Sequence, residues 1–365
     1  MKLTVLPGDG IGPEVTREAL KVLEGVSTHF GFEVEISEGE IGGVAITSND
    51  DPFPASTAEM CLNSEAVLLG AVGAPEFDGI ASEKRPEAGL LRLRKTLGGF
   101  ANLRPAKAFP ALINSSPLRP EIFKGTDMLI VRELLGGIYF GEPRGFSEDN
   151  NSGFNTLVYS REEVRRIARK AFELAGTRRG KVCSVDKSNV LEASRLWREC
   201  VIEVKSEFPE IELEHMYVDA CAMRLVTNPT SFDVVVTSNM FGDILSDESA
   251  VLTGSLGMLP SATVGGEIDL FEPVHGSAPD IAGKSIANPL GAIGCIAMML
   301  RETFDQFSAA EAIEKAIETV LAEGFRTKDI YKGGTDIEVR TEDMGDLVTR
   351  QAIENVSILH QYHAV

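Results

Sequence analysis

The chain of 365 residues is longer than the ~100 to 200 residues of one ordinary domain, so its length predicts two domains or one large α/β unit. Hydrophobic residues make up 43% and charged residues 25%, a globular composition that excludes disordered, fibrous and membrane classes. The formal net charge of −20 repels phosphate backbones and argues against nucleic acid as a partner.

The sequence shows no signal for export or membrane insertion. The first apolar run stops at Pro7 and Gly8, which is too short for the hydrophobic part of a signal peptide. The longest strongly apolar run, residues 292–300, is far shorter than the ~18 residues that a membrane span requires. We therefore expect a cytoplasmic protein that binds no membrane.

The cysteines are scattered and show no CxxC spacing. There are five of them, an odd number, at Cys61, Cys183, Cys200, Cys221 and Cys295. This usage is typical of buried thiols in a reducing compartment. It predicts neither a disulfide nor a zinc site.

The N-terminal segment predicts a strand, a glycine-rich turn and a helix. Residues 2–6 favour a strand, Pro13 suits a first helical turn, and apolar residues then recur at helical spacing. A second strand is expected over 32–36. Short apolar runs at 66–69 and 233–237, each followed by a helical pattern, continue this alternation, which is typical of an α/β protein.

Later segments predict capped helices and a hairpin. Ser160 and Ser308 each stand three residues before a glutamate and an apolar helical pattern, as in a capping box. Residues 138–160 contain two strand-like runs, IYFGEP and FNTLVYS, on either side of SEDNNSG, which predicts a protruding hairpin. The tail after Thr341 has the pattern of a plain helix.

The segment GDGIG, residues 8–12, resembles a dinucleotide-binding fingerprint because it stands between a strand and a helix. That fingerprint requires its third glycine at position 13, where this chain has Pro13. We therefore interpret the segment as a tight structural turn.

Arg94, Arg104 and Arg132 lie in otherwise apolar sequence. A guanidinium holds carboxylates through a planar fork of donors, so converging arginines would favour a substrate with more than one carboxylate. The alternative is structural ion pairing with Glu87 or Glu133.

Asp243 and Asp247 are four residues apart, so on a helix both carboxylates face one side, and Asp219 could join them. A hard divalent cation would relieve their repulsion, and oxygen ligands favour Mg²⁺ or Mn²⁺. Alternatively, Asp243 caps a helix or lies in its first turn, and Asp247 is solvated.

Lys187 follows an apolar strand and is a candidate base, because a desolvated lysine can lose its proton. Tyr139 is a candidate acid, since a phenol can donate a proton to a carbanion. Each residue alone is equally typical of a surface lysine or a half-buried tyrosine.

The segment HGSAPDIAGKSIANP, residues 275–289, predicts a long ordered loop. Its small residues would allow close approach of a flat ligand, and Asp280 could accept hydrogen bonds from ribose hydroxyls. The same pattern also fits an ordinary surface loop.

Taken together and in order, these motifs resemble the isocitrate/isopropylmalate dehydrogenase family of metal-dependent β-decarboxylating dehydrogenases. The resemblance covers essentially the whole chain, through LPGDGIGPEV, GLLRLRKTLGGFANLRPAK, LIVRELLGGIYFGEPRG, DKSNVLEASRLWR, SNMFGDILSDESAVLTGSLGMLPSA and FEPVHGSAPDIAGKSIANP. It implies a two-domain isopropylmalate-dehydrogenase-like α/β fold with a large sheet shared by both domains, unlike a Rossmann fold. The first, NAD-binding domain would comprise residues 1–100 and 254–365, and the second, residues 101–253, would carry the dimerisation arm near 138–160.

The resemblance also implies a homodimer whose arms interlock and whose active sites each receive Lys187 and Asp219 from the neighbouring subunit. The arginines would bind the malate carboxylates, Lys187 would act as the base and Tyr139 as the acid. The metal, Mg²⁺ or Mn²⁺, would be held by Asp219, Asp243 and Asp247, with Asp219 also near the substrate. The NAD-binding residues would be His275, Gly276, Ser277, Ala278, Pro279, Asp280, Ile281, Asn288 and Asn189.

Substrate choice in the family depends on the residues that face the substituent at C3. Here Leu90, Leu91 and Val190 form an apolar set with Glu87 beside it, which fits the isopropyl group of 3-isopropylmalate. The expected reaction is its oxidative decarboxylation to 4-methyl-2-oxopentanoate in leucine biosynthesis. Asp280 followed by Ile281 resembles the NAD-using members. The alternatives are a family enzyme acting on D-malate, tartrate or homoisocitrate, or a non-catalytic dinucleotide-binding homologue.

Overall fold

The computed structural model describes the backbone of residues 1–363, with the side chains of all of these except 251, 253 and 356–363. The chain divides into two compact units. The first unit comprises Met1–Gly99, Phe109–Pro117 and Thr253–Val365, and the second comprises Phe100–Ala108 and Leu118–Leu252. The sequence predicts residues 109–117 in the second domain, whereas they lie with the first unit.

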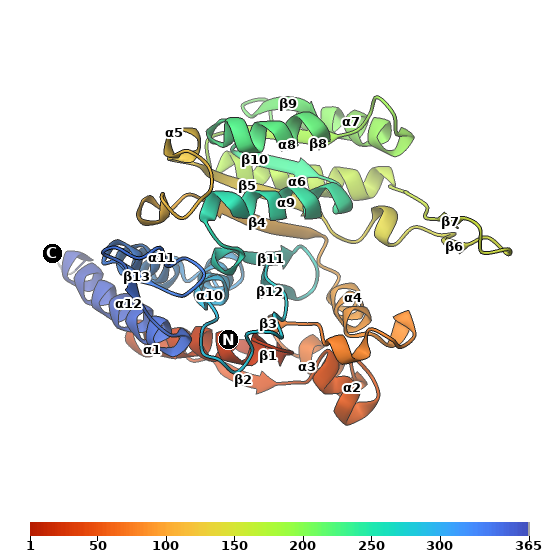
Figure 1. Cartoon of the computed structure of the whole chain (residues 1–365). Coiled ribbons are helices and arrows are strands. Elements are labelled where there is room, and N and C mark those ends of the chain that lie inside the picture. Colours follow the sequence, from red (N-terminus) through yellow and green to blue (C-terminus); the bar gives the residue numbers. More distant parts are fainter. Residues whose placement is uncertain (364–365) are drawn as a thin grey trace. The chain divides into compact units, whose positions relative to one another are not determined.

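The first unit contains a mixed sheet in the strand order β2, β1, β3, β12, β11 (Figure 1). Strand β1 pairs in parallel with β2 and β3, and β12 pairs in parallel with β3 and antiparallel with β11. Strand β3, with the sequence AVLLGA, is buried along its whole length, as expected for a central parallel strand. The strands are β1 (Lys2–Gly8), β2 (Glu35–Glu38), β3 (Ala66–Ala71), β11 (Pro260–Val264), β12 (Asp269–Pro273) and a separate parallel pair, β13 (Phe325–Arg326) with β14 (Ile337–Glu338).

Helices cover this sheet, and α1, α10, α11 and α12 pack on one another. Helix α1 has Pro13 in its first turn, as predicted, and its apolar stripe is buried. The predicted C-terminal helix is confirmed as α12. The helices are α1 (Gly12–Phe30), α2 (Gly43–Asn49), α3 (Ala55–Leu62), α4 (Pro86–Leu97), α10 (Leu290–Glu302), α11 (Phe307–Ala322) and α12 (Thr341–His363).

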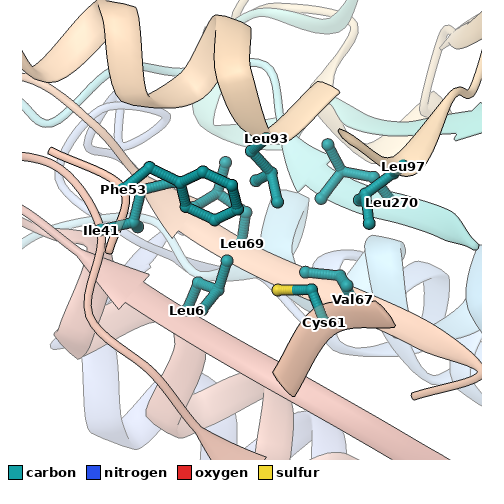
Figure 2. Close-up of a cluster of buried hydrophobic side chains, with 9 residues drawn as sticks. All are labelled: Leu6, Ile41, Phe53, Cys61, Val67, Leu69, Leu93, Leu97 and Leu270. Atoms are coloured by element: carbon teal, nitrogen blue, oxygen red, sulfur yellow. The ribbon is translucent and has the colours of Figure 1, made fainter. Parts of the chain in front are cut away.

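Helix α4 is anchored in a buried hydrophobic cluster of the first unit. Figure 2 shows Leu93 and Leu97 of this helix directed toward side chains from β1, β3 and β12. The cluster consists of Leu6, Ile41, Phe53, Cys61, Val67, Leu69, Leu93, Leu97 and Leu270. Because these side chains are removed from water, the cluster fixes the helix that carries Glu87, Leu91 and Arg94.

The second unit has a mixed sheet in the order β4, β5, β10, β8, β9. Strands β4 and β5 are antiparallel, and the remaining neighbours are parallel. Helices α6 and α7 pack together, with α6 against β5, β8 and β10. The elements are β4 (Ala101–Lys107), α5 (Pro120–Phe123), β5 (Asp127–Glu133), β6 (Gly145–Phe146), β7 (Gly153–Phe154), α6 (Arg161–Gly176), β8 (Lys181–Asp186), α7 (Glu192–Lys205), β9 (Glu212–Tyr217), α8 (Val218–Thr227), β10 (Val234–Thr237) and α9 (Asn239–Thr253).

The hairpin is confirmed, but it is much shorter than the sequence predicts. Strands β6 and β7 pair antiparallel over two residues each and project from the second unit (Figure 1). The run IYFGEP is not a strand, because residues 137–139 form a 3₁₀ turn and Pro143 has no N–H to donate to a ladder. This turn places the Tyr139 hydroxyl against α9 of its own unit rather than along an arm.

Two further expectations about local structure need correction. The capping box at Ser160 is present, with Glu163 as its partner. The one predicted at Ser308 is wrong, because α11 begins at Phe307 and Ser308 lies inside its first turn. The second strand begins at Glu35 rather than at residue 32, because Gly31 ends α1 in a left-handed conformation and the chain must first turn.

All five cysteines are free and buried. Within the described residues, no helix is both long and apolar enough to cross a membrane.

Candidate active site

The second unit brings together two of the predicted arginines, two of the predicted aspartates and Tyr139. Arg104 lies on β4 and Arg132 on β5, which are antiparallel neighbours. Asp243 and Asp247 lie one turn apart on α9, as their spacing predicts. The two strands thus present cations to the carboxylates of one helix face.

Arg132 is almost fully buried, so its guanidinium depends on fixed partners. Its Nη1 donates to Oδ1 of Asp243, and its Nε and Nη2 both donate to Oδ1 of Asn239, at 3.0 and 2.8 Å. At Gly242 a Cβ atom would overlap the Arg132 side chain, so the helix can approach this arginine closely only with glycine there. The aspartate and the asparagine therefore set the plane of the guanidinium.

Arg104 is held in a similar way. Its Nε donates to Oδ1 of Asn102 at 2.8 Å, and its Nη1 donates to Oγ of Ser246 at 2.6 Å and to Oδ1 of Asp247 at 3.3 Å. Its Nη2 lies 3.6 Å from Oδ1 of Asp243. The two arginines thus neutralise much of the repulsion between the two aspartates.

Tyr139 completes this cluster, since its hydroxyl donates to Oδ2 of Asp243 at 3.0 Å. Partial burial and the nearby Asp243 carboxylate raise the pKa of the phenol, so it is protonated at neutral pH. Burial also raises the pKa of Asp247, opposed by Arg104 and assisted by Asp243. The cluster therefore combines a proton donor, Tyr139, with the two aspartates of α9 and the two arginines that contact them.

Lys187 and Asp219 form a separate pair. The Nζ atom of Lys187 donates to Oδ1 of Asp219 at 2.6 Å, and this bond lowers the pKa of the carboxyl. Among the described residues, no three side chains of His, Cys, Asp or Glu gather as a metal site. Asp219 is thus not brought to Asp243 and Asp247 within one chain. Asn189 and Val190, just after Lys187, are exposed.

The remaining predicted substrate residues lie on α4 of the first unit. Arg94 donates from Nε and Nη2 to Oε1 of Glu272, at 3.2 and 2.8 Å, so it has a charged structural partner that the sequence did not suggest. Leu90 is partly buried against the hydrophobic cluster, whereas Glu87 and Leu91 are exposed. Of these four residues of α4, Glu87 and Leu91 are the ones exposed to solvent.

The loop after β12 carries most of the predicted cofactor residues. Gly276, Pro279 and Asp280 are exposed, and Ala278 and Ile281 are partly so. The Nε2 atom of His275 is buried and has no hydrogen-bond partner among the described residues. An orphaned buried nitrogen beside small exposed residues fits a loop that binds a polar ligand.

Asn288, at the far end of this loop, has a structural use. Its Oδ1 accepts from the backbone N–H of Leu290 at the start of α10, and its Nδ2 donates to Oδ2 of Asp329 at 3.0 Å. These bonds hold the end of the loop in place, a structural role separate from the predicted contact with the cofactor.

The glycine-rich turn supports this loop instead of forming a nucleotide site of the Rossmann type. The N–H of Ile11 donates to the Ser277 carbonyl at 2.8 Å, and a Cβ atom at Gly10 would overlap that same carbonyl. The Asp9 carboxylate accepts from the N–H groups of Gly43 and Gly73, both at 2.9 Å. The turn is therefore a structural junction of the first unit, as its Pro13 indicates.

Three buried side chains that hold the predicted arginines were not anticipated from the sequence: Asn102, Asn239 and Glu272. Asn239 begins a helix, a position where asparagine ordinarily reads as a cap. Asn102 and Glu272 lie within strands and have no local motif. Their role is visible only in the folded structure, where they accept hydrogen bonds from Arg104 and Arg94.

Comparison with known proteins agrees with this geometry. The family model described as isocitrate/isopropylmalate dehydrogenase matches residues 2–348. The chain belongs to this family. The 3-isopropylmalate dehydrogenase of Aquifex aeolicus is 56% identical over 349 residues, which cover 95% of this chain and 96% of that protein.

Two solved structures support the fold. Isocitrate dehydrogenase from Methylococcus capsulatus has a TM-score of 0.85 and 34% identity, covering 96% of this chain and 99% of its own. A β-decarboxylating dehydrogenase from Thermococcus kodakarensis has a TM-score of 0.79 and 36% identity, covering 100% and 98%. The predicted fold class, an α/β fold of this dehydrogenase family, is therefore confirmed.

Proposed function

We propose that this protein oxidatively decarboxylates (2R,3S)-3-isopropylmalate to 4-methyl-2-oxopentanoate, with reduction of NAD⁺, in leucine biosynthesis. The observation that carries the proposal is the cluster of Arg104, Arg132, Tyr139, Asp243 and Asp247 in one unit of a chain 56% identical to a 3-isopropylmalate dehydrogenase. A dicarboxylate needs the cations, and a carbanion needs the proton donor.

Arg104 and Arg132 are assigned to the substrate carboxylates, together with Arg94. Asn102 supports Arg104 at Nε, and Asn239 supports Arg132 at Nε and Nη2, while the Nη1 atoms of both arginines donate to the aspartates of α9. A guanidinium is suited to bidentate binding of planar carboxylates, which is the basis of this assignment.

Asp243 and Asp247 would hold Mg²⁺ or Mn²⁺. The donor set fits, because two carboxylates on one helix face offer hard oxygens and no sulfur or nitrogen ligand. When bound, the metal supplies Lewis acidity to the developing ketone. Asp219 of a second subunit is assigned as the third carboxylate, since its own chain pairs it with Lys187.

Lys187 is assigned as the base that accepts the proton of the 2-hydroxyl. Its partner Asp219 orients the amine through the 2.6 Å bond. Tyr139 then donates its phenolic proton to C3 after loss of carbon dioxide. Asp243 holds the Tyr139 hydroxyl at 3.0 Å, which fixes the position of the phenol oxygen.

NAD is proposed to bind the loop from His275 to Asn288, with Asn189 near the nicotinamide. The orphaned Nε2 of His275 and the exposed Gly276 fit that role. Bound NAD⁺ supplies the hydride acceptor. The exposed Asp280 carboxylate would accept from ribose hydroxyls and repel a 2′-phosphate, so we propose NAD rather than NADP.

A homodimer is proposed as the active form. The hairpin exposes Phe146, 74% accessible, and Phe154, and helices α8 and α9 expose Met223 and Ile244, which are 68% and 58% accessible. Large apolar side chains exposed on a projecting hairpin and on helices are typical of subunit contacts. We further propose that the enzyme works in the cytoplasm.

The specificity assignment gives Leu91 and Val190 contact with the isopropyl group, and it includes Leu90 and Glu87 of α4. Leu91 and Val190 are 39% and 66% accessible in the single chain, so both are available to a ligand. Apolar side chains would leave a third carboxylate without a partner, which disfavours isocitrate.

The test is the initial rate of NADH formation with 3-isopropylmalate, NAD⁺ and Mg²⁺, repeated with EDTA and with D-malate or isocitrate. We expect metal-dependent turnover that is fastest with 3-isopropylmalate. Turnover only on D-malate would refute the Leu91 and Val190 assignment. Turnover on none of them would favour a non-catalytic dinucleotide-binding homologue.

A further inference from the structure

The arginines Arg104 and Arg132 share an unusual kind of support. The Nε of Arg104 donates to Oδ1 of Asn102 at 2.8 Å, and the Nε and Nη2 of Arg132 donate to Oδ1 of Asn239 at 3.0 and 2.8 Å. Both asparagine side chains are buried, with 0% and 1% of the residue accessible. In each case a buried amide oxygen fixes the guanidinium from its Nε side.

An amide oxygen orients a guanidinium without adding negative charge beside it. Arg94 shows the contrast, because its Nε and Nη2 both donate to the Glu272 carboxylate. A carboxylate in that position competes with an incoming anion for the cation, since charge-assisted hydrogen bonds are the stronger ones. Arg104 and Arg132 also meet carboxylates, those of Asp243 and Asp247, but only through their Nη atoms. The neutral amides therefore keep a further carboxylate away from Nε.

Asn239 has a second set of contacts. Its Nδ2 donates to the carbonyl oxygens of Leu134 and Gly136, at 2.8 and 3.1 Å, and its backbone N–H donates to the Tyr159 hydroxyl at 2.9 Å. Residues 134–136 lead directly into the turn that carries Tyr139. Asn239 thus connects the guanidinium of Arg132 to the segment that places the proton donor.

We propose that Asn102 and Asn239 are positioning residues for the substrate carboxylates, and that the neutrality of their amides is the property that matters. This inference rests on the proposed function, because it assigns the arginines to a dicarboxylate. It predicts that added charge and lost packing at these positions have separable effects.

The test compares two substitutions at each position in the full-length protein. Asn102→Asp and Asn239→Asp keep the shape and one acceptor oxygen but add negative charge, whereas Asn102→Ala and Asn239→Ala remove the amide and leave a cavity. We expect each aspartate variant to raise KM for 3-isopropylmalate about tenfold or more, with KM for NAD⁺ nearly unchanged. Asn102→Ala should lower the melting temperature more than Asn102→Asp does but raise that KM less.

At Asn102 a purely structural role predicts the reverse order, because aspartate is nearly isosteric with asparagine and should be the milder change. If KM for 3-isopropylmalate follows the loss of melting temperature across the two Asn102 variants, the inference is wrong. Asn239→Asp should also lower kcat more than Asn102→Asp, since it places an oxygen against two carbonyl groups near Tyr139.

Asn63→Asp is the matched control for one added negative charge, because Asn63 is exposed and its amide donates to the Glu59 carbonyl at the end of α3.

A wild type that does not turn over 3-isopropylmalate contradicts the proposed function and not this inference. The same variants are then compared by the rise in melting temperature on adding D-malate or isocitrate. A wild type that neither ligand stabilises would overturn the inference as well.

Discussion

Tyr139 is the residue on which the second half of the proposed reaction depends. Its hydroxyl donates to Oδ2 of Asp243, and replacement by phenylalanine removes only that hydroxyl. We expect Tyr139→Phe to slow protonation of C3 by roughly 10² to 10⁴, the usual contribution of a positioned acid. Substrate binding should change little, because Arg104 and Arg132 remain.

The measurement is turnover of the isolated β-keto acid intermediate by Tyr139→Phe, with Tyr331→Phe as the control. Tyr331 is a surface tyrosine, 36% accessible, in the first unit. Wild-type turnover of the intermediate by Tyr139→Phe would show that another group protonates C3.

The cysteine thiols give a pH-dependent prediction. Burial raises the pKa of Cys61 and of Cys183 from 9.0 to about 12. At pH 8 the folded protein therefore holds almost no thiolate at these positions, and iodoacetamide should label them only after denaturation. Rapid labelling of Cys61 or Cys183 in the native protein would contradict the buried geometry.

The same shifts affect stability at alkaline pH. Below about pH 9 both thiols are protonated in the folded and unfolded chain, so they add no pH dependence. Between pH 9 and about 12 the unfolded chain loses these protons first, and the free energy of unfolding should fall. Replacing Cys61 by Ala should reduce that dependence, measured by urea unfolding at pH 8 and pH 10.

At this scale the sequence predicts charged residues better than neutral ones. The pair Asp243 and Asp247 follows from helical spacing, and the arginines stand out in apolar surroundings. Asn102 and Asn239 have no such signal, because an amide is compatible with caps, turns and strands alike. Their role depends on partners from other strands and becomes visible only in the folded unit.

The turn between β1 and α1 carries a prediction for a whole segment. Gly10 has a φ of +57°, and a Cβ there would overlap the carbonyl oxygen of Ser277 in the proposed NAD-binding loop. Gly10→Ala should displace that loop and raise KM for NAD⁺, by about tenfold for a contact of a few atoms, while KM for 3-isopropylmalate changes less.

Gly31→Ala is the matched control for Gly10→Ala. Gly31 also has a positive φ, +74°, but no atom lies within 4 Å of its ideal Cβ. It carries the conformational cost of about 1 kcal/mol without the collision. Equal KM values for NAD⁺ in the two variants would mean that the turn does not position the loop.

Elements with strong local signals are predicted best. Strand β3 and helix α12 follow from their apolar patterns, and the capping box at Ser160 marks the start of α6. The start of α11 is missed because Ser308 has the residue type of a cap, whereas the N-cap residue is Gln306 and the helix begins at Phe307. The bounds of the two hairpin strands are missed because β propensity alone does not reveal the turn that contains Tyr139.

For the whole molecule, the sequence predicts the family and the two α/β units, but one chain does not assemble the full set of proposed ligands. Within the described residues, Asp219 pairs with Lys187 and joins no cluster of three metal-binding side chains. Composition and spacing alone cannot reveal this separation, because it depends on how the chain folds around α8 and α9. The separation supports a site shared between subunits.

A shared site predicts complementation between inactive variants. Lys187→Ala and Asp247→Asn should each be inactive alone. If Lys187 comes from the partner subunit, unfolding the two variants together and refolding them gives mixed dimers with one intact site each, and random pairing restores about a quarter of wild-type activity. Lys187→Ala mixed with Asp219→Asn should stay inactive, because both residues would come from the same subunit. NADH formation with 3-isopropylmalate and Mg²⁺ measures the result. A site contained within one chain would leave both mixtures inactive, since no chain would then carry a complete set.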